Sequence, residues 1–190
     1  MALSLRPGIE TTKHVLEKPD EAPPTKFRKS RSAGKVLMSI FWDARGVLLT
    51  KFINKGETIN ADYHAQLLVE LREAIKQKRR GMISRGILLL QDNAPAHTAH
   101  TSTSAAEACG IELLPHPPYS PDLAPSDFHL FSNLKRDVRG RHFGSDLAVK
   151  NWVQNWLSEK QQNFYQSGIQ ALQDRLHKCI EINGDYVEKR

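Results

Sequence analysis

The sequence predicts a mixed α/β domain, a sheet flanked by helices, behind an irregular N-terminal segment. Three patterns predict it: a β-hairpin near residue 45, an alternation of short apolar runs with helical stretches from 60 to 114, and three amphipathic helices after 125. The 190 residues suit one domain with a real core, or a domain and a tail. A composition of 39% hydrophobic and 25% charged residues is ordinary for a soluble globular protein.

Residues 1–34 form the irregular segment, and residues 35–190 form the predicted domain. Pro19, Pro23 and Pro24 interrupt any regular element in the first part. A basic stretch at its end is the candidate DNA-binding arm, with Lys26, Arg28, Lys29, Arg31 and Lys35. It is open whether this stretch is a solvated linker, an arm that follows phosphates or a nuclear-localisation patch. The net charge of +6 favours an anionic partner such as nucleic acid.

The first half of the domain begins with a hairpin and a helix. Two runs rich in β-formers, 36–42 and 47–53, flank "DARG", so Asp43 is expected to serve the turn. Asn60 is placed to cap a helix, whose apolar stripe is Tyr63, Leu67, Leu68, Leu71 and Ile75. The basic end of that helix, 76–80, suits either the helix dipole or a DNA contact.

The second half alternates strands with helices and then becomes helical. The run 87–90 is continuously apolar, which is typical of a strand buried on both faces of a parallel sheet. A helix-like segment that closes near Gly110 and a short strand from Ile111 follow it. Three helices come next, the first starting at Ser126, the second at Ser145 and the last spanning about 164–182.

Two aspartates have positions that suit a metal site. Asp92 ends the apolar strand, and ligands of open α/β sheets lie at the carboxyl ends of strands. Asp127 opens a helix after a run of prolines that fix the backbone before it. The 34 residues between them allow one helix and one strand, so both could meet at one sheet edge. Carboxylates that converge on Mg²⁺ ions are the usual holders for phosphodiester cleavage. For each aspartate alone, a helix cap or a dipole contact explains it as well.

Two motifs resemble those of mariner-type transposases of the Tc/mariner superfamily: "QDNAPAHT" at 91–98 and "HPPYSPDLAPSDFHLF" at 116–131. The resemblance implies a ribonuclease-H-like catalytic domain that cuts transposon ends and joins them to target DNA with Mg²⁺ or Mn²⁺. It makes Asp92 and Asp127 catalytic metal ligands, with Asn93, His97 and His129 as candidates for supporting them. It also implies DNA as the partner, a possible homodimer and a nuclear location.

The sequence departs from the family pattern at the first strand, which carries a further aspartate in the family. Nothing before Val36 fits that strand, so the ribonuclease-H-like fold is expected to lack it. The hairpin and the 87–90 strand would then lose a shared neighbour, for which "MALSL" is a short candidate. Three hypotheses follow: a nuclease domain with weak or lost activity, a DNA-binding module without catalysis, and a relic of a decayed element.

Other classes are not supported by the sequence. In one known fusion a mariner domain follows a histone-methylating SET domain, but no SET-domain residues occur here. No apolar run approaches the roughly 20 residues that span a bilayer. The cysteines, Cys109 and Cys179, predict neither a disulfide framework nor a zinc site, and they favour a reducing compartment.

Overall fold

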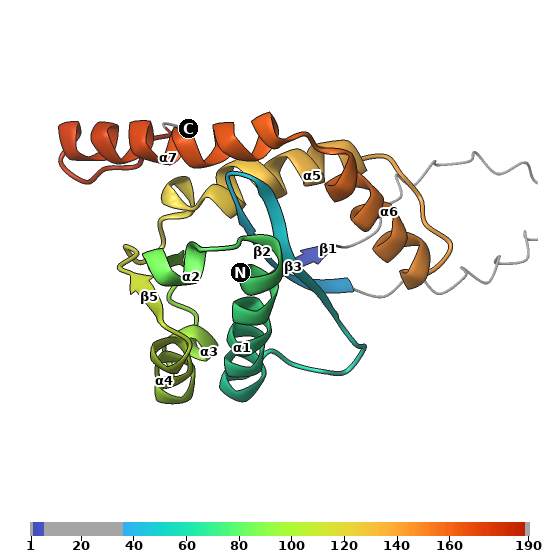
Figure 1. Ribbon diagram of the computed structural model, residues 1–190. Helices are drawn as coiled ribbons and strands as arrows, with labels where there is room; N and C mark the ends of the chain where they lie inside the picture. Colours follow the sequence, from blue (N-terminus) through green and yellow to red (C-terminus); the bar gives the residue numbers. More distant parts are fainter. Residues whose placement is uncertain (1, 6–35, 189–190) are drawn as a thin grey trace, which may run out of the picture.

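The predicted hairpin is present and organises the domain. The computed structural model describes residues 2–5 and 36–188 (Figure 1). Strands β2 (Val36–Asp43) and β3 (Gly46–Ile53) pair antiparallel around the turn. Asp43 serves that turn, as expected, because its carboxylate accepts a hydrogen bond from the Arg45 backbone N–H at 2.8 Å.

A second, separate sheet carries the strand before Asp92. Strands β4 (Ile87–Leu90) and β5 (Ile111–Leu114) are parallel, and they do not pair with the sheet β1-β2-β3. Strand β1 (Ala2–Leu5) pairs antiparallel with β2, but only along Val36–Ser39. The short candidate "MALSL" thus does supply a strand beside β2, so the expectation that the fold lacks a strand before Val36 is wrong in this respect. Among the described strands, the hairpin and β4 still share no neighbour, because β1 does not pair with β4.

The expectation that 87–90 is buried on both faces is wrong. Ile87 is buried, whereas Leu88 is 61% exposed. The physical reason is that successive side chains point to opposite faces. Ile87 and Leu89 face the core beside α1, whereas Leu88 faces the other side, where neither core covers it.

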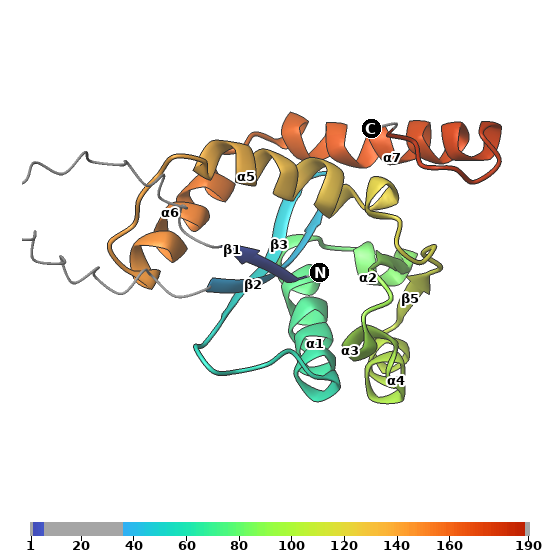
Figure 2. The same ribbon diagram turned by 180° about the vertical axis from the view of Figure 1, so that it is seen from behind.

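Helices cover the hairpin on both sides (Figures 1 and 2). On one side lies α1 (Ala61–Lys78), whose start is capped by Asn60 as predicted, because Asn60 Oδ1 accepts the Tyr63 N–H at 2.9 Å. The short helices α2 (Met82–Arg85) and α3 (Pro95–Thr98) and the helix α4 (His100–Ala108) complete this half. Its core is made by Phe41, Leu48, Leu67, Leu68, Leu71, Ile75, Ile87, Ala106, Cys109 and Ile111.

The other side is formed by the last three helices. A 3₁₀ turn (Pro121–Leu123) and a π-helix (Ser126–Phe131) lead into α5 (Ser132–Val138), and α6 (Asp146–Glu159) and α7 (Gln162–Glu181) follow. The helix starts expected at Ser126 and Ser145 are confirmed, with the Ser145 hydroxyl capping α6. The core of this half is made by Val36, Met38, Ile40, Leu130, Phe131, Leu134, Val149, Val153, Trp156, Leu157 and Tyr165. Alternate β2 side chains thus feed two different cores.

None of the described helices combines the length and the apolar character that a membrane crossing requires.

Candidate active site

Asp92 lies just beyond β4, and a buried histidine holds its carboxylate. His97, from α3, donates a hydrogen bond from Nδ1 to Asp92 Oδ1 at 2.6 Å. The chain can return in this way because a short loop of residues 91–94 follows β4 and Pro95 then starts α3. The hydrogen bond from His97 lowers the pKa of Asp92 to about 2, against the opposing effect of burial. Asp92 is therefore a carboxylate that stays ionised and has one oxygen fixed.

A second buried histidine supports this arrangement from α1. The ring of His64 lies 4.2 Å from the ring of His97, centroid to centroid, and His64 donates from Nε2 to Gln91 Oε1 at 3.1 Å. His64 is only 2% exposed, and its burial, helped by the nearby His97, lowers its pKa to about 4. It is therefore neutral in the folded protein at neutral pH.

Sequence reasoning missed His64, although a signal was present. Its position precedes Leu67, Leu68 and Leu71 by three, four and seven residues, so it belongs to the apolar face of α1. A histidine inside such a stripe is buried and needs a polar partner, which here is Gln91.

Asp127 enters from the other half of the domain. It is the second residue of the π-helix, and Pro125 at the helix start fixes the backbone before it with φ −53°. Burial raises the pKa of Asp127, and the charge of Asp92 raises it further, against the opposing charge of Lys135. Among the described residues, no donor hydrogen-bonds to its carboxylate. A π-helical turn is costly and is frequent at functional sites.

The two carboxylates thus influence one another electrostatically, but they do not form a complete metal-binding cluster. Within residues 2–5 and 36–188, no group of three or more His, Cys, Asp and Glu side chains is arranged to hold a metal ion. Asp92 borders the cavity between the two sheets, and Asp127 borders a separate hollow beside the C-terminal residues.

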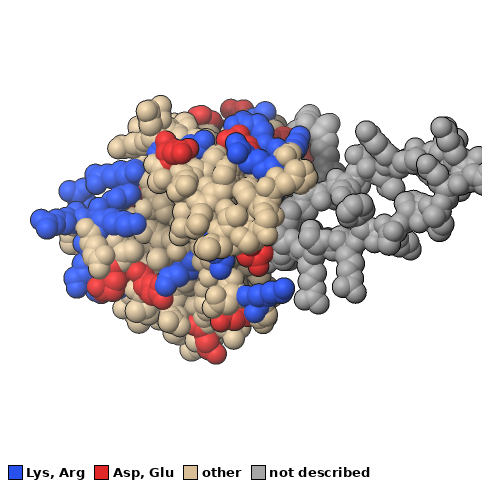
Figure 3. Space-filling model, turned by 90° about the vertical axis from the view of Figure 1, so that its right-hand side faces the viewer, with Lys and Arg blue, Asp and Glu red and all other residues tan. Residues whose placement is uncertain are grey.

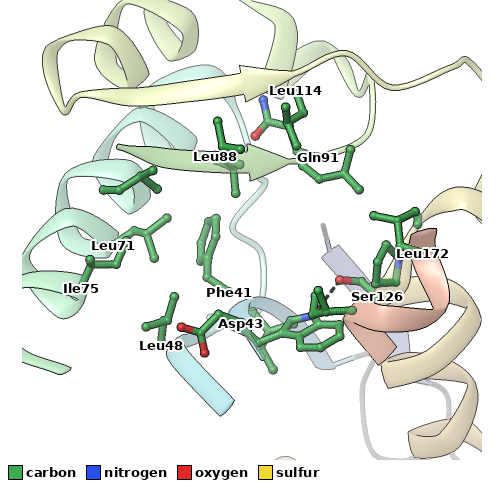
Figure 4. A pocket seen from close by; sticks show the side chains of 18 of the residues that line it. Phe41, Asp43, Leu48, Leu71, Ile75, Leu88, Gln91, Leu114, Ser126 and Leu172 are labelled. Carbon is green, nitrogen blue, oxygen red and sulfur yellow. Dashed lines mark hydrogen bonds between the residues drawn. The ribbon is translucent and has the colours of Figure 1, made fainter. Parts of the chain in front are cut away.

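The cavity beside Asp92 is mostly apolar. It has a volume of about 350 Å³ and lies between the edge of β2 and the edge of β4 (Figure 4). Phe41, Leu71 and Leu88 contribute to its walls, and Leu172 and Ser126 close one end. The cavity thus occupies the space between the two sheets, which do not pair with one another.

Asn93 and His129 contact backbone groups and not the carboxylates. Asn93 donates from Nδ2 to the His116 carbonyl at 2.8 Å, which ties the Asp92 loop to the start of the proline-rich loop. His129 donates from Nε2 to the Phe164 carbonyl at 2.8 Å, and its ring packs against Trp42 and Phe164.

The predicted basic arm lies outside the described residues: Lys26, Arg28, Lys29, Arg31 and Lys35. On the described body, basic side chains form separate groups with acidic ones between them (Figure 3). At the end of α1, Arg79 binds both oxygens of Asp43 at 2.7 and 2.8 Å. Lys78 donates to the Val47 and Leu48 carbonyls. These two cations of the 76–80 stretch are therefore engaged within the fold.

Comparison with known proteins places this arrangement in a family. The family model described as "Transposase (partial DDE domain)" matches residues 10–85. The solved catalytic domain of Mos1 mariner transposase bound to raltegravir and Mg aligns with a TM-score of 0.78 at 38% identity, over 81% of this chain and 78% of that one. This chain belongs to the mariner transposase family. Its fold is accordingly ribonuclease-H-like, as the sequence predicted.

Two curated mariner relatives extend the comparison. The Mos1 transposase of Drosophila mauritiana is 36% identical over 172 residues, which cover 90% of this chain and 50% of that protein. The histone-lysine N-methyltransferase SETMAR of Homo sapiens is 36% identical over 155 residues, covering 81% of this chain and 23% of that protein. This mariner chain therefore spans half the length or less of these relatives. A pre-cleavage Mos1 transpososome aligns with a TM-score of 0.83 at 33% identity, over 98% of this chain and 55% of that one.

Proposed function

We propose that this mariner chain acts on DNA in transposition, as a metal-dependent phosphodiester-cleaving domain with Asp92 and Asp127 as the ligands of Mg²⁺ or Mn²⁺. The observation that carries the proposal is Asp127, a half-buried carboxylate that accepts no hydrogen bond from a described donor. Its pKa is raised by burial and by the charge of Asp92, although the charge of Lys135 opposes this. A divalent cation bound between the two side chains would offset both the burial of the Asp127 carboxylate and its repulsion from Asp92. Mos1 catalytic-domain structures with Mg and with Mn, and a Mos1 complex with a transposon end, support the divalent metal and the DNA in this proposal.

The residues around Asp92 have supporting roles in this proposal. His97 fixes one carboxylate oxygen and leaves the other to a cation, and Gln91 and His64 hold His97 in turn. Asn93 connects the loop that carries Asp92 to the start of the proline-rich loop that leads to Asp127, and His129 anchors the π-helix to α7. When bound, the metal would activate a water and stabilise the leaving oxygen of the phosphodiester.

We further propose that cleavage by this 190-residue chain is weak. The reason is the ligand count, since the described residues offer two carboxylates but no third ligand beside them. Two ligands hold Mg²⁺ less firmly and orient it less well than a full set. A nuclear location goes with this proposal, because the DNA substrate is there.

The second candidate function is a DNA-binding module without catalysis. The net charge of +6 and the incomplete ligand set among the described residues favour it. A methyltransferase function gains no support from the SETMAR match, because the alignment covers only 23% of that protein.

One experiment separates these functions. The chain is incubated with supercoiled plasmid and Mn²⁺, and nicking by the wild type is compared with Asp92→Asn, Asp127→Asn and the exposed control Asp174→Asn. We expect slow, Mn²⁺-dependent nicking that both site variants lose and the control retains. Nicking that survives Asp92→Asn would refute the assignment, and efficient strand transfer would refute weak activity.

DNA binding is measured in parallel on a duplex of about 30 base pairs at several salt concentrations. Steeply salt-dependent binding that survives Asp127→Asn, with no nicking by any variant, would favour the DNA-binding module. No binding at low salt would exclude it.

A further inference from the structure

The C-terminal residues fold back onto the proline-rich loop that leads to Asp127. The Val187 backbone N–H donates to Asp122 Oδ2 at 2.8 Å, and the Tyr186 hydroxyl donates to the Tyr119 carbonyl at 3.1 Å. Asp122 and Val187 are both buried, at 7% and 8% exposure. Residues 186–188, called here the tail, thus attach to the loop at two points before Asp127.

Arg175 of α7 joins the tail, the loop and the π-helix. Its Nη1 donates to the Asp122 carbonyl at 3.0 Å, and its Nη2 pairs with Glu188 Oε1 at 2.5 Å. The guanidinium also lies over the ring of Phe128, 4.0 Å from its centroid. Phe128 directly follows Asp127 in the chain. The Arg175 guanidinium therefore contacts the loop before the predicted ligand and the residue after it.

The loop depends on these contacts because its own conformation is costly. Tyr119 has φ +54°, a left-handed conformation that an aromatic residue adopts only where its surroundings hold it. Asp122 Oδ1 is buried without a hydrogen-bond partner among the described residues, so the carboxylate relies on the bond from the Val187 N–H to Oδ2. Without the tail, the Asp122 carboxylate would lose its described hydrogen bond from Val187 and would be opened to water, so the loop would lose the contact that fixes it at this point.

We propose that Arg175 and the tail form a clamp that positions Asp127 for metal binding. The metal part of this inference rests on the proposed function, whereas the clamp itself rests only on the contacts above. Arg175, Tyr186 and Val187 are positioning residues in this account, because they act through the loop and the π-helix.

The first test is hydrogen–deuterium exchange of the loop 119–128 in the 190-residue chain. Arg175→Ala should speed exchange of these amides about tenfold or more, while the Arg141→Ala control, whose guanidinium lies over Trp152 in α6, should leave them unchanged. Tyr186→Phe removes only the hydroxyl that holds Tyr119, so it tests the clamp even if Arg175→Ala unfolds. Unchanged loop exchange in folded variants would overturn the clamp.

The second test is Mn²⁺ affinity, measured from the free-ion signal in electron paramagnetic resonance. Arg175→Ala should weaken binding about tenfold, the range found for residues that orient ligands. In an Asp127→Asn background the same change should alter affinity less than about twofold, because the ligand it positions is gone. Equal losses in both backgrounds would mean a merely structural role and would overturn the positioning role. If the wild type binds no Mn²⁺, the proposed function fails, and the exchange experiment still decides whether the clamp exists.

Discussion

Gly168 gives the sharpest test of the packing that holds the π-helix. It lies inside α7, where alanine would normally stabilise the helix by about 1 kcal/mol. A Cβ atom at this position would lie 2.5 Å from His129 Cδ2 and 3.0 Å from Trp42 Cη2. The His129 ring cannot retreat easily, since its Nε2–H binds the Phe164 carbonyl and its ring packs between two aromatic rings.

The gain in helix propensity and the cost of the close contact together set the expected change in the free energy of unfolding. Overpacking of a tight site typically costs about 1–3 kcal/mol, and this contact is at the severe end. After the gain in helix propensity, we expect Gly168→Ala to destabilise the fold by about 1–2 kcal/mol, a drop in Tm of roughly 2–8 °C for a domain of this size. His129 shares the π-helix with Asp127, so the strain is transmitted to the predicted ligand.

The assay is thermal and urea unfolding followed by circular dichroism. Gly144→Ala is the matched control, because Gly144 is exposed and an alanine Cβ there would have no described atom within 4 Å. It should change stability by less than about 0.5 kcal/mol. In a His129→Ala background the two closest contacts are removed and the 3.0 Å approach to Trp42 Cη2 remains, so Gly168→Ala should cost clearly less than in the wild type. An equal cost in both backgrounds, or a more stable Gly168→Ala single variant, would refute the reasoning.

Three further predictions concern stability. His64 has its pKa lowered to about 4, so between about pH 6.5 and pH 4 the unfolded chain binds a proton there that the folded chain does not. Stability should therefore fall by up to about 3 kcal/mol as the pH falls through that window. Urea titrations at about pH 7 and about pH 4.5 should show a smaller loss of stability for His64→Asn than for the wild type. Arg79→Ala leaves the half-buried Asp43 carboxylate without its two charged hydrogen bonds and should cost about 2 kcal/mol in urea unfolding, whereas Arg80→Ala on the exposed side should cost almost nothing; equal costs would contradict the ion-pair argument. Asn60→Ala removes the cap of α1 and should cost about 1 kcal/mol, and an unchanged urea midpoint would show that the cap is not needed.

Sequence was sufficient to predict the elements that depend on neighbouring residues. The hairpin around "DARG", the cap at Asn60 and the helix starts at Ser126 and Ser145 all follow from local turn chemistry, capping and periodicity. The motifs around Asp92 and Asp127 also indicated the family, which the comparisons then confirmed.

The hydrogen-bond partner of each polar side chain, in contrast, could be read only from the tertiary structure. His97 contacts Asp92, whereas His129 contacts α7, although both lie near an aspartate in sequence. Leu88 is exposed because it points to the face of β4 away from the core that holds Ile87, and an apolar run cannot reveal which faces will be covered. The bond from Val187 to Asp122 joins residues 65 positions apart. The physical reason is that secondary structure follows from local backbone preferences, while burial and hydrogen-bond partners depend on chain segments that only the fold brings together.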